Sequence, residues 1–453
     1  MRRSREAALP ATVLIVKLNL AFVATAVLMG FAAFVACTTP DPEGEPSSPD
    51  ASTPATGDDG GEPGDSGEAA TANDADATSA TCDGDAKCLV SSAGDLRVGR
   101  SGHTQTTLAN GRVLVIGGYN LAGGLASTEI FDPITGTWHL GPASVVTREA
   151  HRVVPLAAGG ALVAGGYVPA GLVTASVELF DEATETLTPT APMTAARRAF
   201  AMVRLKDGRV LAMGGGAAGM ATCTKSPCSL ESAELFDPVT KTWTLTGSMG
   251  FKRSSFFATV LADGKVLVGG GVGRPAPDGP DSGAGGSLGT TEIYDPATGV
   301  FTPGPPTVEA TAASFETAVT VASGKVLLVR ANEPRDGGTS NCEIYDPSTS
   351  SWSLTGKMLP GTRRGYVLVV LADGRVLVAG GSDAADPATG RKTVEVFDPS
   401  TETWTSAADL KTARMSAEGS RLLSGQVLIS GGWENQNPAI DMLQSSELLP
   451  VAP

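Results

Sequence analysis

The chain has 453 residues, a formal net charge of -15 at pH 7, and aromatic side chains at only 5% of its positions. The negative charge opposes any general affinity for nucleic acid, whose phosphate backbone attracts basic proteins. Only 3 histidines are present, which disfavours metal sites built from several imidazoles. We therefore expect no nucleic acid partner, no cofactor and no metal. No catalytic residue is recognisable from a motif.

The first 36 residues have the pattern of a signal peptide. A basic start at Arg2 and Arg3 precedes an apolar run over residues 18–36. The run ends in Phe34-Val35-Ala36-Cys37, which resembles the lipobox of bacterial lipoproteins. That resemblance implies that Cys37 is acylated and becomes the new N-terminus.

The residues after Cys37 bear on the destination of the chain. They are threonines rather than an aspartate, which, by the same resemblance, favours the outer membrane. Two alternatives stay open: an uncleaved membrane anchor, since about 20 apolar residues can span a bilayer, and an ordinary cleaved signal. All three export the remainder of the chain to the cell envelope.

Residues 37–85 form the next region, which consists of Cys37 and a polar tail. The tail is rich in Asp, Glu, Gly, Pro, Ser and Thr and contains no Lys or Arg. Such a composition cannot bury enough apolar surface to offset the entropy lost on ordering. We predict a disordered acidic linker over residues 37–85, followed by a folded region over residues 86–453.

One pattern recurs about every fifty residues from residue 100 onward. In its first copy, the turn pair Asn110-Gly111 precedes an apolar run that ends at Gly117-Gly118. A Glu-apolar-aromatic-Asp segment follows at residues 129–132, and Trp138 comes seven positions after its aromatic residue. Seven copies can be counted, and the last copy stops near Leu449.

Each copy predicts four short strands. The Asn-Gly and Asp-Gly pairs favour a two-residue type I′ hairpin between the first and second strands. The apolar run predicts a buried second strand, and the Asp-Pro-x-Thr-Gly segment predicts a tight turn between the third and fourth strands. Four strands in a period of about fifty residues are typical of a propeller blade.

The apolar run, glycine pair, aromatic-Asp pair and later Trp resemble the kelch family. The predicted fold class is therefore all-β: a seven-bladed kelch-type β-propeller over residues 86–453. The seventh copy is one strand short, so we predict that the segment around residues 87–95 supplies its fourth strand and closes the ring. Such pairing would remove two exposed strand edges.

Charged residues recur at fixed places in the repeats. An arginine stands eleven residues before the turn glycine in six copies, whereas the fifth copy has Ala313. The third strand begins near a glutamate in all seven copies. We predict structural, bidentate and partly buried ion pairs within or between blades; the alternative is an anion-binding funnel. The residues are Arg100, Arg148, Arg197, Arg253, Arg363 and Arg414, with Glu129, Glu178, Glu234, Glu292, Glu343, Glu395 and Glu447.

Five cysteines remain besides Cys37. In an exported protein, Cys82 with Cys88 and Cys223 with Cys228 are candidates for short disulfides. Metal binding is the alternative for these pairs. Cys342, on a predicted third strand, is expected to be a buried free thiol.

The connections between second and third strands vary in length, and variable loops on a rigid scaffold are typical of binding surfaces. Candidate residues for this rim are Tyr119, Tyr167 and Trp433, which follow glycine pairs, and Arg330, which replaces a glycine in the fifth copy. The alternative is that the aromatic residues pack between blades. We expect a monomeric, surface-tethered module that binds a protein or a glycan at the cell envelope.

The alternative function is an enzyme. Some kelch propellers resemble galactose oxidase, whose copper site uses two His, two Tyr and a Cys joined to a Tyr. His103 and His151 occupy equivalent places in adjacent repeats here, and His139 is the third imidazole. A hydrolase or isomerase acting on carbohydrates is a further alternative.

Overall fold

The computed structural model describes residues 90–168, 171–217, 229–276, 286–308, 317–330, 341–358, 363–383, 388–435 and 442–450. All of them lie in one unit of the chain, Ser79–Pro453. These residues form strands β1 to β35 and contain no α-helix. Within them there is accordingly no helical segment with the length and apolar character needed to cross a bilayer.

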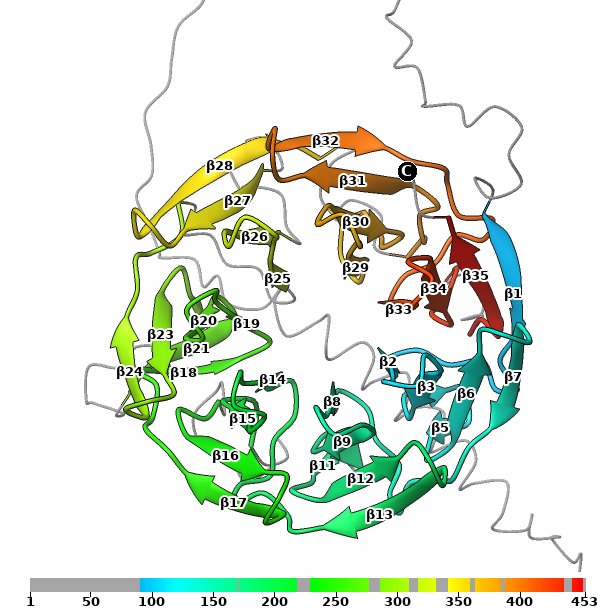
Figure 1. The fold of residues 1–453 in the computed structure, drawn as a ribbon, viewed down its shortest axis with the longest axis horizontal. Coiled ribbons are helices and arrows are strands. Elements are labelled where there is room, and N and C mark those ends of the chain that lie inside the picture. Colours follow the sequence, from blue (N-terminus) through cyan, green and yellow to red (C-terminus); the bar gives the residue numbers. More distant parts are fainter. Residues whose placement is uncertain are drawn as a thin grey trace, which may run out of the picture. The chain divides into compact units, whose positions relative to one another are not determined.

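The strands form seven four-stranded antiparallel sheets, which we number in chain order (Figure 1). The first strands are β2 (Thr104–Thr107), β8 (Arg152–Pro155), β14 (Ala201–Arg204), β19 (Phe257–Val260), β25 (Thr317–Thr320), β29 (Val367–Val370) and β33 (Glu418–Arg421). The second strands are β3 (Val113–Ile116), β9 (Ala161–Ala164), β15 (Val210–Met213), β20 (Val266–Gly269), β26 (Val326–Val329), β30 (Val376–Ala379) and β34 (Val427–Ser430). The third strands are β6 (Thr128–Asp132), β12 (Val177–Asp181), β16 (Ala233–Asp237), β23 (Thr291–Asp295), β27 (Asn341–Asp346), β31 (Val394–Asp398) and β35 (Ser445–Leu449). The fourth strands are β7 (Thr137–Leu140), β13 (Thr186–Thr190), β17 (Thr242–Leu245), β24 (Val300–Pro303), β28 (Ser351–Lys357), β32 (Thr403–Ser406) and β1 (Ser91–Asp95).

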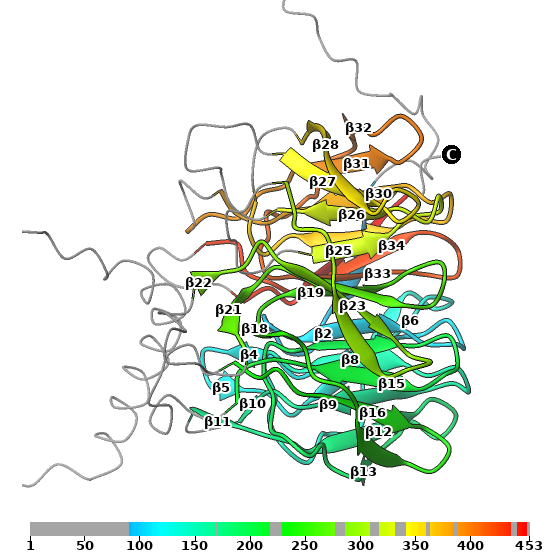
Figure 2. The ribbon, with the colours of Figure 1, turned by 90° about the vertical axis from the view of Figure 1, so that its left-hand side faces the viewer.

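Short additional strands lie on one side of the sheets, where the second and third strands are connected. Figure 2 shows several of them on this side, which we call the loop face. They are β4 (Tyr119–Asn120), β5 (Gly123–Gly124), β10 (Tyr167–Val168), β11 (Leu172–Val173), β18 (Phe251–Ser254), β21 (Val272–Pro275) and β22 (Gly286–Ser287).

The apolar runs form the second strands, as predicted. Every residue of β3, Val113–Ile116, is buried, because each face of the strand packs against side chains of a neighbouring sheet. The predicted aromatic pair of the repeat joins the third and fourth strands: Phe131 lies opposite Trp138, with ring centroids 5.2 Å apart. The repeat motif therefore specifies both the buried strand and the cross-strand contact that covers it.

The predicted type I′ turn between first and second strands is wrong. In the first sheet, the Gly111 N–H donates to the Leu108 carbonyl and the Leu108 N–H donates to the Arg112 carbonyl. Gly111 has φ +86°, whereas Asn110 is not left-handed. This is a three-residue loop with a glycine bulge. The Asn110 side chain accepts the Arg112 N–H at 3.0 Å, which favours this arrangement over a two-residue turn.

Apolar clusters join each sheet to the next one along the chain. A further cluster joins the first and the seventh sheets, where Val113 and Val115 pack with Leu422 and Leu428. The first strands of these two sheets, β2 and β33, are neighbours. The hydrophobic core is therefore divided among the interfaces between sheets.

The glycine pairs lie where one sheet meets the next. In five of the described pairs, the second glycine donates its N–H to the carbonyl of an arginine in another sheet, as Gly118 does to Arg148 at 2.7 Å. A Cβ on Gly117 would lie 2.6 Å from the Arg148 carbonyl oxygen, and φ is +65° there. Close approach and the left-handed backbone together require glycine at this position.

Strand β1 lies beside the last strand of the chain. Ser91 pairs with Leu448, and Ser92 pairs with Glu447, in antiparallel register. The order of the seventh sheet is therefore β1-β35-β34-β33.

Candidate functional site

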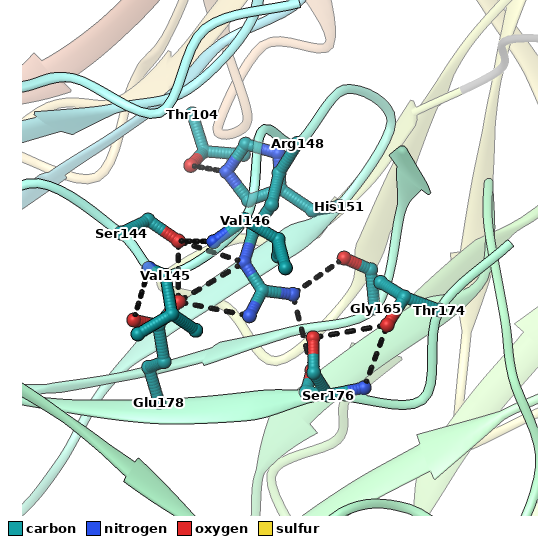
Figure 3. A network of polar contacts seen from close by, with 10 residues as sticks. All are labelled: Thr104, Ser144, Val145, Val146, Arg148, His151, Gly165, Thr174, Ser176 and Glu178. Carbon is teal, nitrogen blue, oxygen red and sulfur yellow. Dashed lines mark hydrogen bonds and ion pairs between the residues drawn. The ribbon is translucent and has the colours of Figure 1, made fainter. Parts of the chain in front are cut away.

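The repeated arginines lie between the strands of their own sheet. Figure 3 shows this network around Arg148 in the second sheet. Its Nη2 donates to Glu178 Oε2 at 2.9 Å, and its Nη1 donates to the carbonyls of Gly165 and Ser176 at 2.9 and 3.0 Å. Both side chains of the ion pair are fully buried. The arginine therefore ties the end of the second strand to the start of the third.

The same within-sheet ion pair occurs in six sheets. The pairs are Arg100–Glu129, Arg148–Glu178, Arg197–Glu234, Arg253–Glu292, Arg363–Glu395 and Arg414–Glu447. All of these arginines are 0% exposed. Burial lowers the pKa of each guanidinium, and the paired glutamate opposes that change.

Two details of the predicted pairs are wrong. They are fully rather than partly buried, and a single carboxylate oxygen takes the arginine contacts. Arg197 Nε and Nη2 both donate to Glu234 Oε1, at 3.0 and 2.9 Å. Glu234 Oε2 instead accepts the backbone N–H and the hydroxyl of Thr194. A two-oxygen fork does not form because Nη1 is directed at two backbone carbonyls.

The fifth sheet keeps its buried ion pair with a different arginine. Ala313 lies outside the described residues. Arg330, at the end of β26, pairs with Glu343 through Nε at 2.9 Å and through Nη2. Only 5% of Arg330 is exposed. Its prediction as a residue of the binding rim is therefore wrong: the side chain replaces the missing arginine, because a buried glutamate needs a positive partner.

Trp433 also lies away from the surface. It is 4% exposed, and its backbone forms bridges with Met415 and Met442. Its prediction as a rim residue is wrong, and the packing alternative holds. Cys342 is buried and free, and burial raises the pKa of its thiol to about 12.

Other predicted residues lie outside the described part of the chain. They are Cys37, Cys82, Cys88, Cys223 and Cys228.

Two histidines lie in the interfaces between sheets. Burial and the nearby Arg100 charge lower the pKa of His103 to about 3, and burial also lowers the pKa of His151 well below its usual value. His151 Nε2 lies 2.8 Å from the Thr104 hydroxyl. Its ring occupies the space that a Cβ on Gly117 would need. Phe200 takes the same place against Gly165, so this position is one for a packed ring.

Two oppositely charged side chains of the first strands interact electrostatically. Arg152 begins β8 and Glu418 begins β33. Burial raises the pKa of Glu418 to about 7, although the charge of Arg152 opposes this. No ion pair within 4.0 Å joins these two described residues.

Four side chains of the first three sheets gather on the loop face. Tyr119 and Tyr167 follow the glycine pairs of the first and second sheets, and Glu149 and Arg198 follow the buried arginines of the second and third. We call these four residues the rim cluster. Backbone bridges fix them: Tyr167 pairs with Glu149, and Arg198 pairs with Gly216. The Arg198 guanidinium carbon lies 4.2 Å from the centre of the Tyr167 ring.

The rim cluster is electrostatically coupled and half-buried. Burial raises the pKa of Glu149, and the positive charge of Arg198 opposes the shift. Burial also raises the pKa of Tyr167, which interacts with both charges. The pKa of Tyr119 is raised by burial and by Glu149, whereas a hydrogen bond with the Ser101 side chain lowers it. Glu149 therefore interacts electrostatically with Arg198 and with both tyrosines.

A shallow open groove of about 550 Å³ lies where the first sheet meets the seventh. Its lining includes the β4–β5 turn, with Asn120 and Leu121, and residues 442–445. Leu121 is 61% exposed. The groove therefore begins one residue beyond Tyr119 of the rim cluster.

The glycine pairs of the sequence predicted the two tyrosines of the rim cluster, but no motif predicted Glu149 and Arg198. A signal was available, because each follows a repeated arginine at the same place in its repeat. Unlike the repeated arginines, these two residues differ from copy to copy. The repeat therefore does not fix the residue at this position.

Comparisons with known proteins bear on the fold. The kelch motif matches residues 103–143 and 363–411. A fungal alcohol oxidase of the AA5 family, solved in complex with copper, is similar to 80% of this chain over 75% of its own, with a TM-score of 0.59 and 18% identity. At that identity the likeness concerns the fold alone. Together with the small antiparallel sheets, the motif matches support a kelch-repeat protein.

Proposed function

We propose that the seven sheets form one closed, seven-bladed kelch-type propeller in which β1 completes the seventh blade. The support is the apolar cluster between the first and seventh sheets and the hydrogen bond from the Gly432 N–H to the Arg100 carbonyl at 2.8 Å. This bond repeats, between the first and seventh sheets, the contact that four other glycine pairs make with an arginine carbonyl. Pairing with β1 covers the edge of β35 that would otherwise be exposed.

Disulfide trapping tests the closure. We expect cysteines at Ser91 and Leu448, which are paired residues of β1 and β35, to cross-link on mild oxidation, with the joined peptides identified by mass spectrometry. Cysteines at Ser91 and Leu354 are the control, because Leu354 lies on β28 of the fifth sheet. Failure of the first pair to cross-link, or equal cross-linking of the control pair, would contradict closure.

We further propose that the chain is an exported, monomeric binding module that is lipid-anchored to the outer membrane through Cys37. It contacts a protein or a glycan of the cell envelope through the loop face. The observation that carries this proposal is the rim cluster: no ion pair within 4.0 Å joins its charged groups to another described residue, whereas each of the six repeated arginines is paired with a glutamate inside its sheet. Variable exposed groups on a rigid scaffold are typical of recognition surfaces.

The anchor is tested separately from the binding. Mass spectrometry of the N-terminal peptide should show an acylated Cys37, and membrane fractionation should place the protein with the outer membrane. Cys37→Ser should release it from that anchor. An unmodified Cys37 in membrane-bound protein would support the uncleaved anchor instead.

Binding through the loop face is tested with the full chain in detergent on arrays of envelope proteins and glycans. Leu121→Asp with Leu172→Asp alters two exposed tips of the loop face, 61% and 58% exposed. Ile134→Asp is the control, since Ile134 is 93% exposed in a turn between third and fourth strands. We expect the first variant to lose binding and the control to keep it. Absence of binding by the wild type would contradict the proposal.

An enzyme is the second candidate function, and the copper-containing AA5 relative is the reason to consider it. The described residues do not fit such a copper site. No group of three or more His, Cys, Asp or Glu side chains within them could hold a metal. The rings of His103 and His151 fill packing positions against Gly431 and Gly117. Copper titration with an absorption scan for a radical tests this candidate, and stoichiometric copper would favour the oxidase.

A further inference from the structure

The rim cluster contains two charged groups that the protein leaves unsatisfied. Within the described residues, no carboxylate lies within 4.0 Å of the Arg198 guanidinium, and Arg198 Nε is buried with no hydrogen-bond partner. The side chain of Glu149 likewise has no ion pair and no hydrogen bond there. A half-buried polar group without a partner costs free energy. These groups therefore have unused hydrogen-bonding capacity at the surface.

Glu149 and Arg198 interact electrostatically but form no ion pair within 4.0 Å. Glu149 and Arg198 stand at equivalent positions of adjacent sheets, immediately after Arg148 and Arg197. Those two arginines are fixed by their buried ion pairs, so the backbone that carries the charges is rigid. The Tyr167 ring stacks with Arg198, and the Tyr167 backbone forms a bridge with Glu149. The cluster is therefore preorganised rather than formed on binding.

The charges of the cluster constrain the ligand. A carboxylate would satisfy Arg198 but would be repelled by Glu149, and an ammonium group would suffer the reverse. A hydroxyl group both donates and accepts, so vicinal hydroxyls suit a carboxylate and a guanidinium at once. The tyrosine rings offer apolar surface for the C–H face of a sugar. We propose that the rim cluster binds a neutral carbohydrate, with Glu149 accepting from its hydroxyls and Arg198 donating to its oxygens.

This inference rests on the proposed binding function and names the class of its ligand. The test uses the full chain in detergent and immobilised neutral oligosaccharides, with acidic oligosaccharides and envelope proteins in parallel. Arg198→Gln and Glu149→Gln should each weaken binding to neutral oligosaccharides at least tenfold, because each removes a charge-assisted hydrogen bond. Tyr167→Ala should also weaken it, through loss of stacking.

Lys392→Gln is the matched control. Lys392 is exposed and precedes the third strand of the sixth sheet on the same face. Its substitution by Gln removes one positive charge, as Arg198→Gln does. We expect its binding to match the wild type. Melting temperatures should change little in Arg198→Gln and Glu149→Gln, since neither residue has an ion pair within 4.0 Å among the described residues and Arg198 loses only its stacking on Tyr167. A lower melting temperature would show that these residues are structural and would overturn the assignment.

The other outcomes separate the inference from the function on which it rests. Binding only to acidic oligosaccharides or only to proteins would overturn the neutral-carbohydrate assignment and leave the binding module standing. Neutral oligosaccharides that bind equally well to Arg198→Gln and Glu149→Gln would overturn the location. No binding to any probe would contradict both proposals.

Discussion

Removal of Glu234 tests whether the repeated ion pairs hold the sheets together. This carboxylate accepts two donations from Arg197 and two from Thr194. Glu234→Ala would leave the Arg197 guanidinium, which is 0% exposed, buried without its counter-charge. Breaking a buried pair by removing one partner costs about 3 to 5 kcal/mol. For a unit the size of Ser79–Pro453, the entropy of unfolding converts that cost to a fall of about 4 to 6 °C in melting temperature.

Differential scanning calorimetry at pH 7 measures this effect. Lys265→Gln is the control, because Lys265 is 44% exposed and lies 4.0 and 3.9 Å from Asp263 and Asp295. Exposed pairs of this kind contribute less than about 1 kcal/mol, so its melting temperature should change by about 1 °C or less. Equal shifts for the two variants would refute the view that burial makes the repeated pairs structural. Glu234→Ala should create no new binding specificity.

The remaining predictions concern the fifth sheet and pH. Arg330→Met should destabilise the protein by about 3 to 5 kcal/mol in thermal unfolding, because it removes the positive charge that is paired with the buried Glu343; wild-type stability would favour Arg330 as a rim residue after all. His103 has a pKa of about 3 when folded, against 6.5 for the free side chain, so its contribution to stability is present above pH 6.5 and is lost as the pH falls. His103→Phe places the same residue type at this position as Phe200 of the third sheet. When the pH is lowered from 7 to 5, the free energy of unfolding of this variant should therefore fall by about 2 kcal/mol less than that of the wild type. Parallel pH profiles of the two proteins in chemical denaturation would contradict this. The pKa of Glu418 is instead raised to about 7 from 4.5, so its contribution is complete below pH 4.5 and is lost as the pH rises through 7. Glu418→Gln should be less sensitive to pH between 5 and 8, and an unchanged profile would show that the Glu418 carboxylate is well solvated when folded.

Much of the fold could be predicted from local patterns. The apolar runs predicted the buried second strands, and the aromatic and Trp positions predicted the contact between Phe131 and Trp138. The turn type was not predictable from the Asn-Gly pair alone. The Asn110 side chain and the Gly111 bulge together set that loop, and both were compatible with either turn.

The site was predictable only in part. Tyr119 and Tyr167 could be predicted because they follow glycine pairs. Glu149 and Arg198 could not, since a charged residue beside a repeated arginine does not by itself indicate a binding site. Arg330 was assigned to the surface because it broke the glycine pattern. Its actual partner, Glu343, lies in the next strand. Only the folded sheet could therefore show that Arg330 takes the role of the arginine that the fifth copy lacks.

The amino-acid order by itself determined the repeat and its strands, because strand alternation acts over a few neighbouring residues. Only the tertiary structure decided which side chains meet across sheets: the Gly117 backbone against the His151 ring, or Arg198 against Tyr167. Those contacts depend on how two twisted sheets pack face to face. No short stretch of sequence records that geometry.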